Sequence, residues 1–271
     1  MLDSHPDWFK EALSVNKEQR RIEVEGNFIS YQHWGDETKP GMVLVHGSGS
    51  HSHWWDFIAP LLLDNFQISA IDLSGMGDSD HRDDYSPELY GKEILSVAED
   101  SGFFSVGEPI ICGHSMGGFM SAYAGLVSDK KLGGVIMIDS PIRPPTYDYS
   151  THVRSGPIRR IKTYPDRESI LERFRLTPEQ ECANEYLVRY IAEWSIKEAD
   201  NGYQWKFDDT IFDKLGFSHM QKNQAFELEC ELGIIYGTES NMMTDEILGF
   251  IKDNVPDGTP MIAIEKAAHH I

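Results

Sequence analysis

The sequence has little positive charge, few cysteines and no long apolar run. Its 271 residues include 24 Lys and Arg against 44 Asp and Glu, which gives a formal net charge of −20. A surface this acidic repels the phosphate backbone of nucleic acids and the anionic headgroups of membranes. We therefore expect no nucleic acid and no membrane surface among the partners of this protein.

No segment of the sequence approaches the roughly 18 apolar residues that a membrane-spanning helix needs. The first residues, MLDSHPDWFKEALS, contain acids where a signal peptide carries basic residues, so no signal peptide is expected. The three cysteines, Cys112, Cys182 and Cys230, lie far apart without CxxC spacing. This excludes a zinc site made of cysteine alone and a disulfide framework, and it favours a reduced, cytoplasmic location.

Short apolar runs alternate with segments of helical character along most of the chain. This alternation predicts an α/β fold with a mostly parallel central sheet and helices on both faces. The turn at Gly26-Asn27 predicts that the first two strands form an antiparallel hairpin. The predicted strands are residues 22–25, 28–34, 42–46, 66–71, 109–112, 132–138, 232–236 and 261–264. The predicted helices of this alternating part are residues 54–63, 87–99, 117–127 and 245–253.

The pattern changes after Pro141. Residues 142–228 lose the apolar strands and gain charge and helical periodicity, with predicted helices at residues 166–175 and 179–199. We expect residues 142–228 to form a helical cap inserted over the carboxyl edge of the sheet, where open α/β sheets bind ligands. The core domain then consists of residues 1–141 and 229–271.

One serine lies in a G-x-S-x-G pattern, Gly113-His114-Ser115-Met116-Gly117. The pattern follows a predicted strand and opens a predicted helix, and the tight turn between them explains the glycines on both sides. Such a turn lifts the Ser115 hydroxyl above the sheet edge, in the position of a nucleophile. The plainer alternative is a serine that only caps the helix.

Backbone N–H groups for a developing oxyanion are expected in two places. The segment His46-Gly47-Ser48-Gly49 ends the predicted strand 42–46, and its flexible backbone can direct the N–H of Ser48 toward the site. The N–H of Met116, directly after the serine, is the second expected donor.

A histidine late in the chain supplies the candidate base. His269 lies five residues after the last predicted strand, and a serine nucleophile needs a base within hydrogen-bond reach. The order of serine first and histidine late is that of the α/β hydrolases. His270, the next residue, is the competing candidate.

Taken together, HGSG, DLSGMGDSD, GHSMGG and the late AAHH resemble the α/β-hydrolase superfamily, in its branch with a serine nucleophile and a helical cap. The resemblance covers residues 20–271. It implies an α/β-hydrolase fold, Ser115 as nucleophile, His269 as base, and no cofactor or metal. Relatives usually continue into a final helix after this histidine, and the sequence leaves open whether such a helix follows Ile271.

The acid of the expected catalytic triad departs from the family pattern. Many relatives carry Asp in a G-x-x-D segment where this sequence has Ser240. Asp139, which ends the predicted strand 132–138, occupies the position that some haloalkane dehalogenases use. We favour Asp139 over Glu239 and Asp245, and a dyad without an acid remains an alternative.

These residues predict a serine hydrolase of the carboxylesterase type, which cleaves an ester of a small or medium apolar substrate through an acyl-enzyme. The alternatives are a carbon–carbon bond hydrolase acting on a vinylogous diketone, and a ligand-binding receptor on a hydrolase scaffold. Ser115 disfavours the haloalkane dehalogenase and epoxide hydrolase chemistries, because those relatives attack with Asp. His51 and His53 have no third ligand nearby in the sequence, so no metal is expected there. The sequence leaves the natural substrate and the oligomeric state open.

Overall fold

The computed structural model describes residues 5–147, 161–215 and 226–271. Two stretches of the predicted cap, residues 148–160 and 216–225, lie outside the described residues. The strands of the main sheet are β1 (Glu18–Val24), β2 (Asn27–Trp34), β3 (Gly41–Val45), β4 (Gln67–Ile71), β5 (Ile110–His114), β6 (Gly134–Ile138), β9 (Leu232–Gly237) and β10 (Met261–Ile264).

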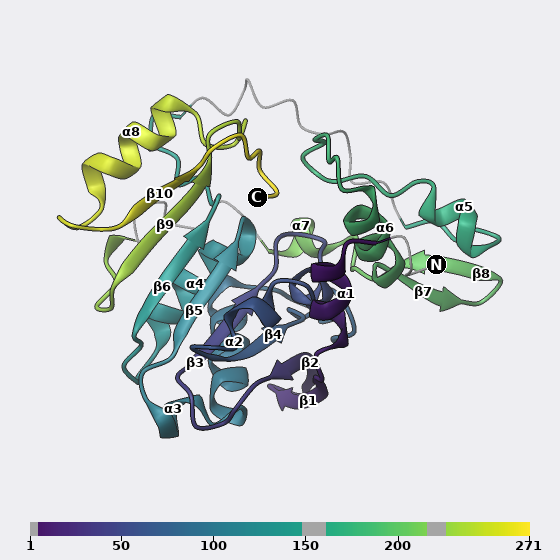
Figure 1. The fold of residues 1–271 in the computed structure, drawn as a ribbon, viewed down its shortest axis with the longest axis horizontal. Coiled ribbons are helices and arrows are strands. Elements are labelled where there is room, and N and C mark those ends of the chain that lie inside the picture. Colours follow the sequence, from purple (N-terminus) through teal and green to yellow (C-terminus); the bar gives the residue numbers. More distant parts are fainter. Residues whose placement is uncertain (1–4, 148–160, 216–225) are drawn as a thin grey trace.

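These eight strands form one sheet in the order β1-β2-β4-β3-β5-β6-β9-β10 (Figure 1). All neighbours from β4 to β10 run parallel, whereas β2 is antiparallel to both β1 and β4. The mostly parallel sheet and the N-terminal hairpin that the sequence predicts are confirmed. The parallel strands β3 and β4 are buried along their whole length, and β3 has the nearly continuous apolar sequence that such burial favours.

Helices cover the two faces of the sheet unequally. On one face, apolar side chains of α2 (Pro87–Asp100), α4 (Met116–Val127) and α8 (Asp245–Asn254) pack on the strands. On the other face, the short 3₁₀ helices η2 (Ser52–Trp55) and η3 (Ala59–Leu62) cover β3 and β4. Two further helices are α1 (Asp7–Ser14) and α3 (Phe103–Val106). No helix within the described residues has the length and apolarity that crossing a bilayer requires.

The predicted helix at residues 54–63 is wrong. The chain there forms η2 and η3 instead, and Pro60 lies at the start of η3. Proline has no backbone N–H and its ring clashes with the preceding turn, so a continuous helix through residue 60 would lose a hydrogen bond and be kinked.

The inserted segment leaves the sheet after β6 and returns at β9, its direct neighbour. Its described part contains α5 (Arg167–Leu171), α6 (Glu185–Trp194), β7 (Ile196–Ala199), β8 (Gly202–Trp205) and α7 (Ile211–Lys214). The predicted helix at residues 179–199 is therefore too long, because β7 and β8 form a hairpin with the turn Asp200-Asn201. Asn201 in the turn and Gly202 directly after it have positive φ, which Asn and Gly adopt most readily.

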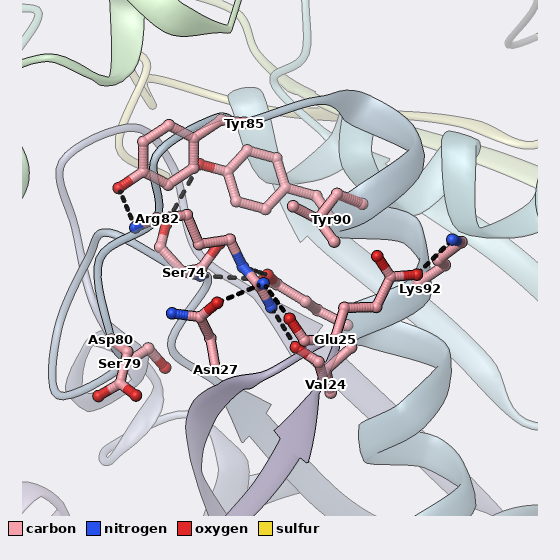
Figure 2. Close-up of polar contacts among 12 residues, drawn as sticks. Val24, Glu25, Asn27, Ser74, Ser79, Asp80, Arg82, Tyr85, Tyr90 and Lys92 are labelled. Atoms are coloured by element: carbon pink, nitrogen blue, oxygen red, sulfur yellow. Dashed lines mark hydrogen bonds and ion pairs between the residues drawn. The ribbon is translucent and has the colours of Figure 1, made fainter.

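A buried arginine joins the N-terminal hairpin to the loop after β4 and to α2. Arg82 donates to the carbonyl of Val24 at 2.6 Å and to Asn27 Oδ1 at 2.8 Å, as Figure 2 shows. Its Nε donates to Glu93 Oε1 at 2.9 Å, and the other oxygen of Glu93 accepts from the Ser74 N–H at 2.9 Å. The ion pair is thus buried with several of its polar atoms satisfied, which is the condition for such a pair to be stable.

Candidate active site

Ser115 lies in a strained turn between β5 and α4. Its φ of 54° and ψ of −119° are unusual for any residue other than glycine. A Cβ at Gly113 would lie 2.2 Å from the Gly117 carbonyl, and one at Gly117 would lie 2.4 Å from the His46 carbonyl. The two glycines therefore permit the close approach that creates the turn. Backbone strain of this kind persists only when the surrounding structure maintains it. At a polar residue such as Ser115, it points to a functional role.

His269 brings its ring against this serine. Its Nε2 lies 3.1 Å from Ser115 Oγ, across 154 residues of sequence. Its Nδ1 lies 2.6 Å from Asp139 Oδ2, and the ring is only 3% exposed. A carboxylate accepts but cannot donate, so Nδ1 carries the proton and Nε2 presents its lone pair to the Ser115 hydroxyl. The structure thus brings together the three side chains that the sequence singled out.

Asp139 follows β6 directly and is fully buried. Its Oδ1 accepts the N–H of Gly237 at 2.9 Å, and its Oδ2 accepts the hydroxyl of Ser240 at 2.6 Å. Ser240 stands where many relatives carry the acid, and here it donates to an acid on the neighbouring strand. Glu239 and Asp245 are exposed, and Asp245 begins α8.

The loop after β3 lies beside the serine. A Cβ on Gly47 would be 3.4 Å from Ser115 Cβ. His46 Nε2 accepts the N–H of Leu73 at 3.1 Å, so Nδ1 is protonated and donates to the Gly47 carbonyl at 2.7 Å. In a trans peptide the C=O and the next N–H point in opposite directions. The Ser48 N–H therefore points away from His46.

Two further histidines lie beside the His269 ring: His270, the competing candidate for the base, and His114, which sequence reasoning did not assign to the site. His114 Nε2 donates to the His269 carbonyl at 2.9 Å, with the ring centroids 4.8 Å apart. Burial, assisted by the charge of His269, lowers the pKa of His114 to about 3 and that of His270 to about 4. Both rings are therefore uncharged at neutral pH. The GHSMG motif contains His114, but nothing in the motif indicates that its ring reaches residue 269.

A glutamine of the inserted segment binds the backbone of the loop that carries the candidate base. Gln180 Oε1 accepts the N–H of His270 at 2.8 Å, and Gln180 Nε2 donates to its carbonyl at 3.1 Å. Sequence reasoning missed Gln180 as well, since a single glutamine in a polar segment carries no signal.

An apolar cavity of about 350 Å³ adjoins the site. Its wall comes from the η2–η3 region, from the strand ends and from the inserted segment, and His114 and His270 also line it. The apolar lining consists of Trp54, Trp55, Phe57, Ile58, Ile138, Leu176, Leu187, Val188, Ile191, Ile235, Ile264 and Ile271.

His51 and His53 contact the inserted segment. His53 Nδ1 donates to Asp56 Oδ2 at 2.7 Å, and its ring stacks on Trp194 with centroids 3.6 Å apart. His51 Nε2 donates to Ser195 Oγ at 2.9 Å. The two histidines therefore hold the end of α6 against η2.

Comparison with known proteins gives matches in sequence and in structure. The family model described as the alpha/beta hydrolase family matches residues 42–214. The uncharacterized hydrolase YugF of Bacillus subtilis (strain 168) is 29% identical over 243 residues, which is 84% of this chain and 83% of that protein.

Two solved structures show the same fold. The thioesterase domain from the curacin biosynthetic pathway has a TM-score of 0.74 at 19% identity, over 94% of both chains. The esterase Rv0045c from Mycobacterium tuberculosis has a TM-score of 0.71 at 20% identity, over 97% of this chain and 89% of that one. At these identities the likeness concerns the fold alone.

Proposed function

This chain belongs to the alpha/beta hydrolase family, and on that premise we propose that it is a serine hydrolase that cleaves carboxylic esters through an acyl-enzyme. The observation that carries the proposal is the hydrogen-bonded path from Ser115 Oγ through His269 to Asp139, with distances of 3.1 and 2.6 Å. The path supplies a nucleophile, a base and a buried acid in the order that acyl transfer needs.

In the proposed reaction, Ser115 Oγ attacks the ester carbonyl carbon while His269 Nε2 takes the hydroxyl proton. Asp139 stabilises the resulting imidazolium through Nδ1. The imidazolium then protonates the leaving alcohol as the carbon–oxygen bond breaks. A water molecule, deprotonated by His269, attacks the acyl-enzyme and releases the acid, and the proton returns to Ser115.

Two backbone N–H groups are proposed to bind the oxyanion of the tetrahedral intermediate. One is the N–H of Ser48, which points away from His46 because His46 holds the Gly47 carbonyl at 2.7 Å. The other is the N–H of Met116, in the first turn of α4, where backbone donors have no partner within the helix. Donors that are already oriented stabilise developing charge without reorganising.

We propose that the acyl group or the alcohol group of the ester is small to medium and apolar. The cavity volume of about 350 Å³ lies near the lower end of the range of about 300–1,000 Å³ that small-molecule pockets occupy. Residues 142–228 would act as a cap over this cavity. The names of the two similar folds, a thioesterase domain and an esterase, are in keeping with acyl transfer.

The test is hydrolysis of p-nitrophenyl esters together with labelling by a fluorophosphonate. We expect Ser115→Ala to lose both label and turnover, the latter by on the order of 10⁶ in kcat. Ser105→Ala, at an exposed serine in α3, is the matched control and keeps both. Turnover of a vinylogous diketone in place of every ester, or a Ser115→Ala variant that hydrolyses esters like the wild type, would refute the proposal.

Acyl chain length tests the pocket. Each methylene that enters the cavity contributes about 0.8 kcal/mol, so kcat/KM rises about fourfold per added carbon until the cavity is full and then falls. A kcat/KM that does not change from acetate to decanoate would contradict an enclosed apolar pocket.

A further inference from the structure

Three imidazole rings meet at the candidate active site. The ring centroids of His114, His269 and His270 lie 4.8, 5.0 and 5.5 Å apart in pairs. One nitrogen of each ring can be chosen so that all three lie within 4.8 Å of one another. Within the described residues, this is the one group of three or more histidine, cysteine or acidic side chains arranged closely enough to hold a metal ion.

We propose that His114, His269 and His270 form a binding site for a divalent transition-metal ion such as Zn²⁺, and that the bound ion inhibits the enzyme by occupying His269 Nε2. The binding of the ion does not depend on the proposed function, whereas the inhibition rests on the proposed function.

The hydrogen bonds of two of the rings leave a lone pair free. His269 donates its Nδ1 proton to Asp139 at 2.6 Å, so its Nε2 is unprotonated. His114 donates its Nε2 proton to the His269 carbonyl at 2.9 Å, so its Nδ1 is unprotonated. Histidines that bind metals usually donate their other N–H to a carboxylate or a backbone carbonyl in this way. The two rings thus have the outer partners of a metal site.

The third ring lacks good partners. Both ring nitrogens of His270 are buried, and neither makes a hydrogen bond of ordinary geometry. The carbonyls of Thr177 and Pro178 lie beside the ring and partly offset the lowering of its pKa by burial. A buried polar atom without a partner is costly, and a metal ion would satisfy one of these nitrogens.

The donor set determines which ion fits. Uncharged imidazoles suit Zn²⁺, Cu²⁺ and Ni²⁺, whereas Mg²⁺ and Ca²⁺ require oxygen ligands. Zinc–nitrogen bonds of about 2.0–2.1 Å place two ligands of a tetrahedral site about 3.4 Å apart. The three nitrogens are within 4.8 Å, so the rings must move inward by about an ångström to bind the ion.

Occupation of the site removes the base. His269 Nε2 lies 3.1 Å from Ser115 Oγ and takes its proton in the proposed reaction. A lone pair that is bound to a metal ion cannot accept that proton. The ion therefore blocks the formation of the acyl-enzyme, and a chelator restores activity.

Binding is tested first, by calorimetric titration of Zn²⁺ into the full chain. We expect one ion per chain in the wild type and in Ser115→Ala, and no binding of Mg²⁺. His270→Ala and His114→Gln should each weaken binding by at least roughly 100-fold, the upper end of the effect of changing an outer partner of a ligand. His81→Ala, which removes a histidine with a side chain 45% exposed, is the control and binds like the wild type.

Inhibition is then measured for each variant against its own rate without metal. We expect Zn²⁺ to inhibit ester hydrolysis by the wild type and by His81→Ala at the concentration at which it binds. The His270→Ala and His114→Gln variants should be inhibited only at about 100-fold higher concentrations.

Two results would overturn the site: no stoichiometric zinc, or equal affinity in His270→Ala and His81→Ala. Bound zinc with full activity would overturn the inhibition. Since calorimetry needs no turnover, zinc that binds through His270 to a chain without esterase activity refutes the proposed function and leaves the binding site intact.

Discussion

The buried His114 makes the stability of this protein depend on pH. Burial lowers its pKa to about 3, whereas histidine in an unfolded chain titrates near 6.5. Below pH 6.5 the unfolded chain therefore binds a proton that the folded chain does not. The stabilising contribution is complete above pH 6.5 and is lost as the pH falls toward 3. At pH 5 the loss relative to pH 8 is about 2 kcal/mol.

Urea denaturation of the wild type and of His114→Gln at pH 8 and pH 5 measures this contribution. Glutamine keeps an N–H donor for the His269 carbonyl and does not titrate. We expect the free energy of unfolding to fall between the two pH values by about 2 kcal/mol less in the variant than in the wild type. An identical fall in both proteins would mean that His114 protonates equally well in the folded state, and the reasoning would be wrong.

Three further experiments test the site and the fold. Asp139→Asn should lower kcat by roughly 10⁴, whereas Glu239→Gln should change it by less than about tenfold; equal effects in ester kinetics would remove Asp139 from the proposed triad. Ser240→Ala should lower the free energy of unfolding in urea by about 1–3 kcal/mol, because a buried carboxylate loses a donor; no change would mean the bond contributes nothing. Arg82→Met should cost about 3–5 kcal/mol by leaving Glu93 unpaired, and adding Glu93→Leu should recover most of it; a double variant no more stable than the single one contradicts this.

The mostly parallel sheet and the position of Ser115 could be predicted from the sequence because local signals coincide there. In the GHSMG motif, a buried strand, two glycines and a small-residue helix all indicate the same turn. The hairpin β7–β8 could also have been predicted, since Asn201-Gly202 is a strong turn signal. A helix is predicted there instead, because the residues that flank the turn are charged and aromatic and resemble one face of a helix.

The surroundings of His269 could not be predicted in full, because its partners come from distant parts of the chain. In the sequence, Ser240 indicates only that the usual acid is missing from its position. In the structure, its hydroxyl donates to Asp139, 101 residues away. The ring of His114 meets the carbonyl of His269 across 155 residues. No periodicity or spacing in a single sequence records such contacts, which arise only when β5, β6 and β9 align at the same edge of the sheet.

The position of β9 beside β6 has a consequence for the order of folding. Asp139 ends β6, but its carboxylate is held by Gly237 and Ser240, and its partner His269 lies 130 residues later. Closing loops of this length is slow compared with forming helices and hairpins. During refolding, the helical signal should therefore return before the proposed ester hydrolysis does. Chains that stop before the final strands would contain Ser115 and Asp139, the proposed nucleophile and acid, without His269, the proposed base.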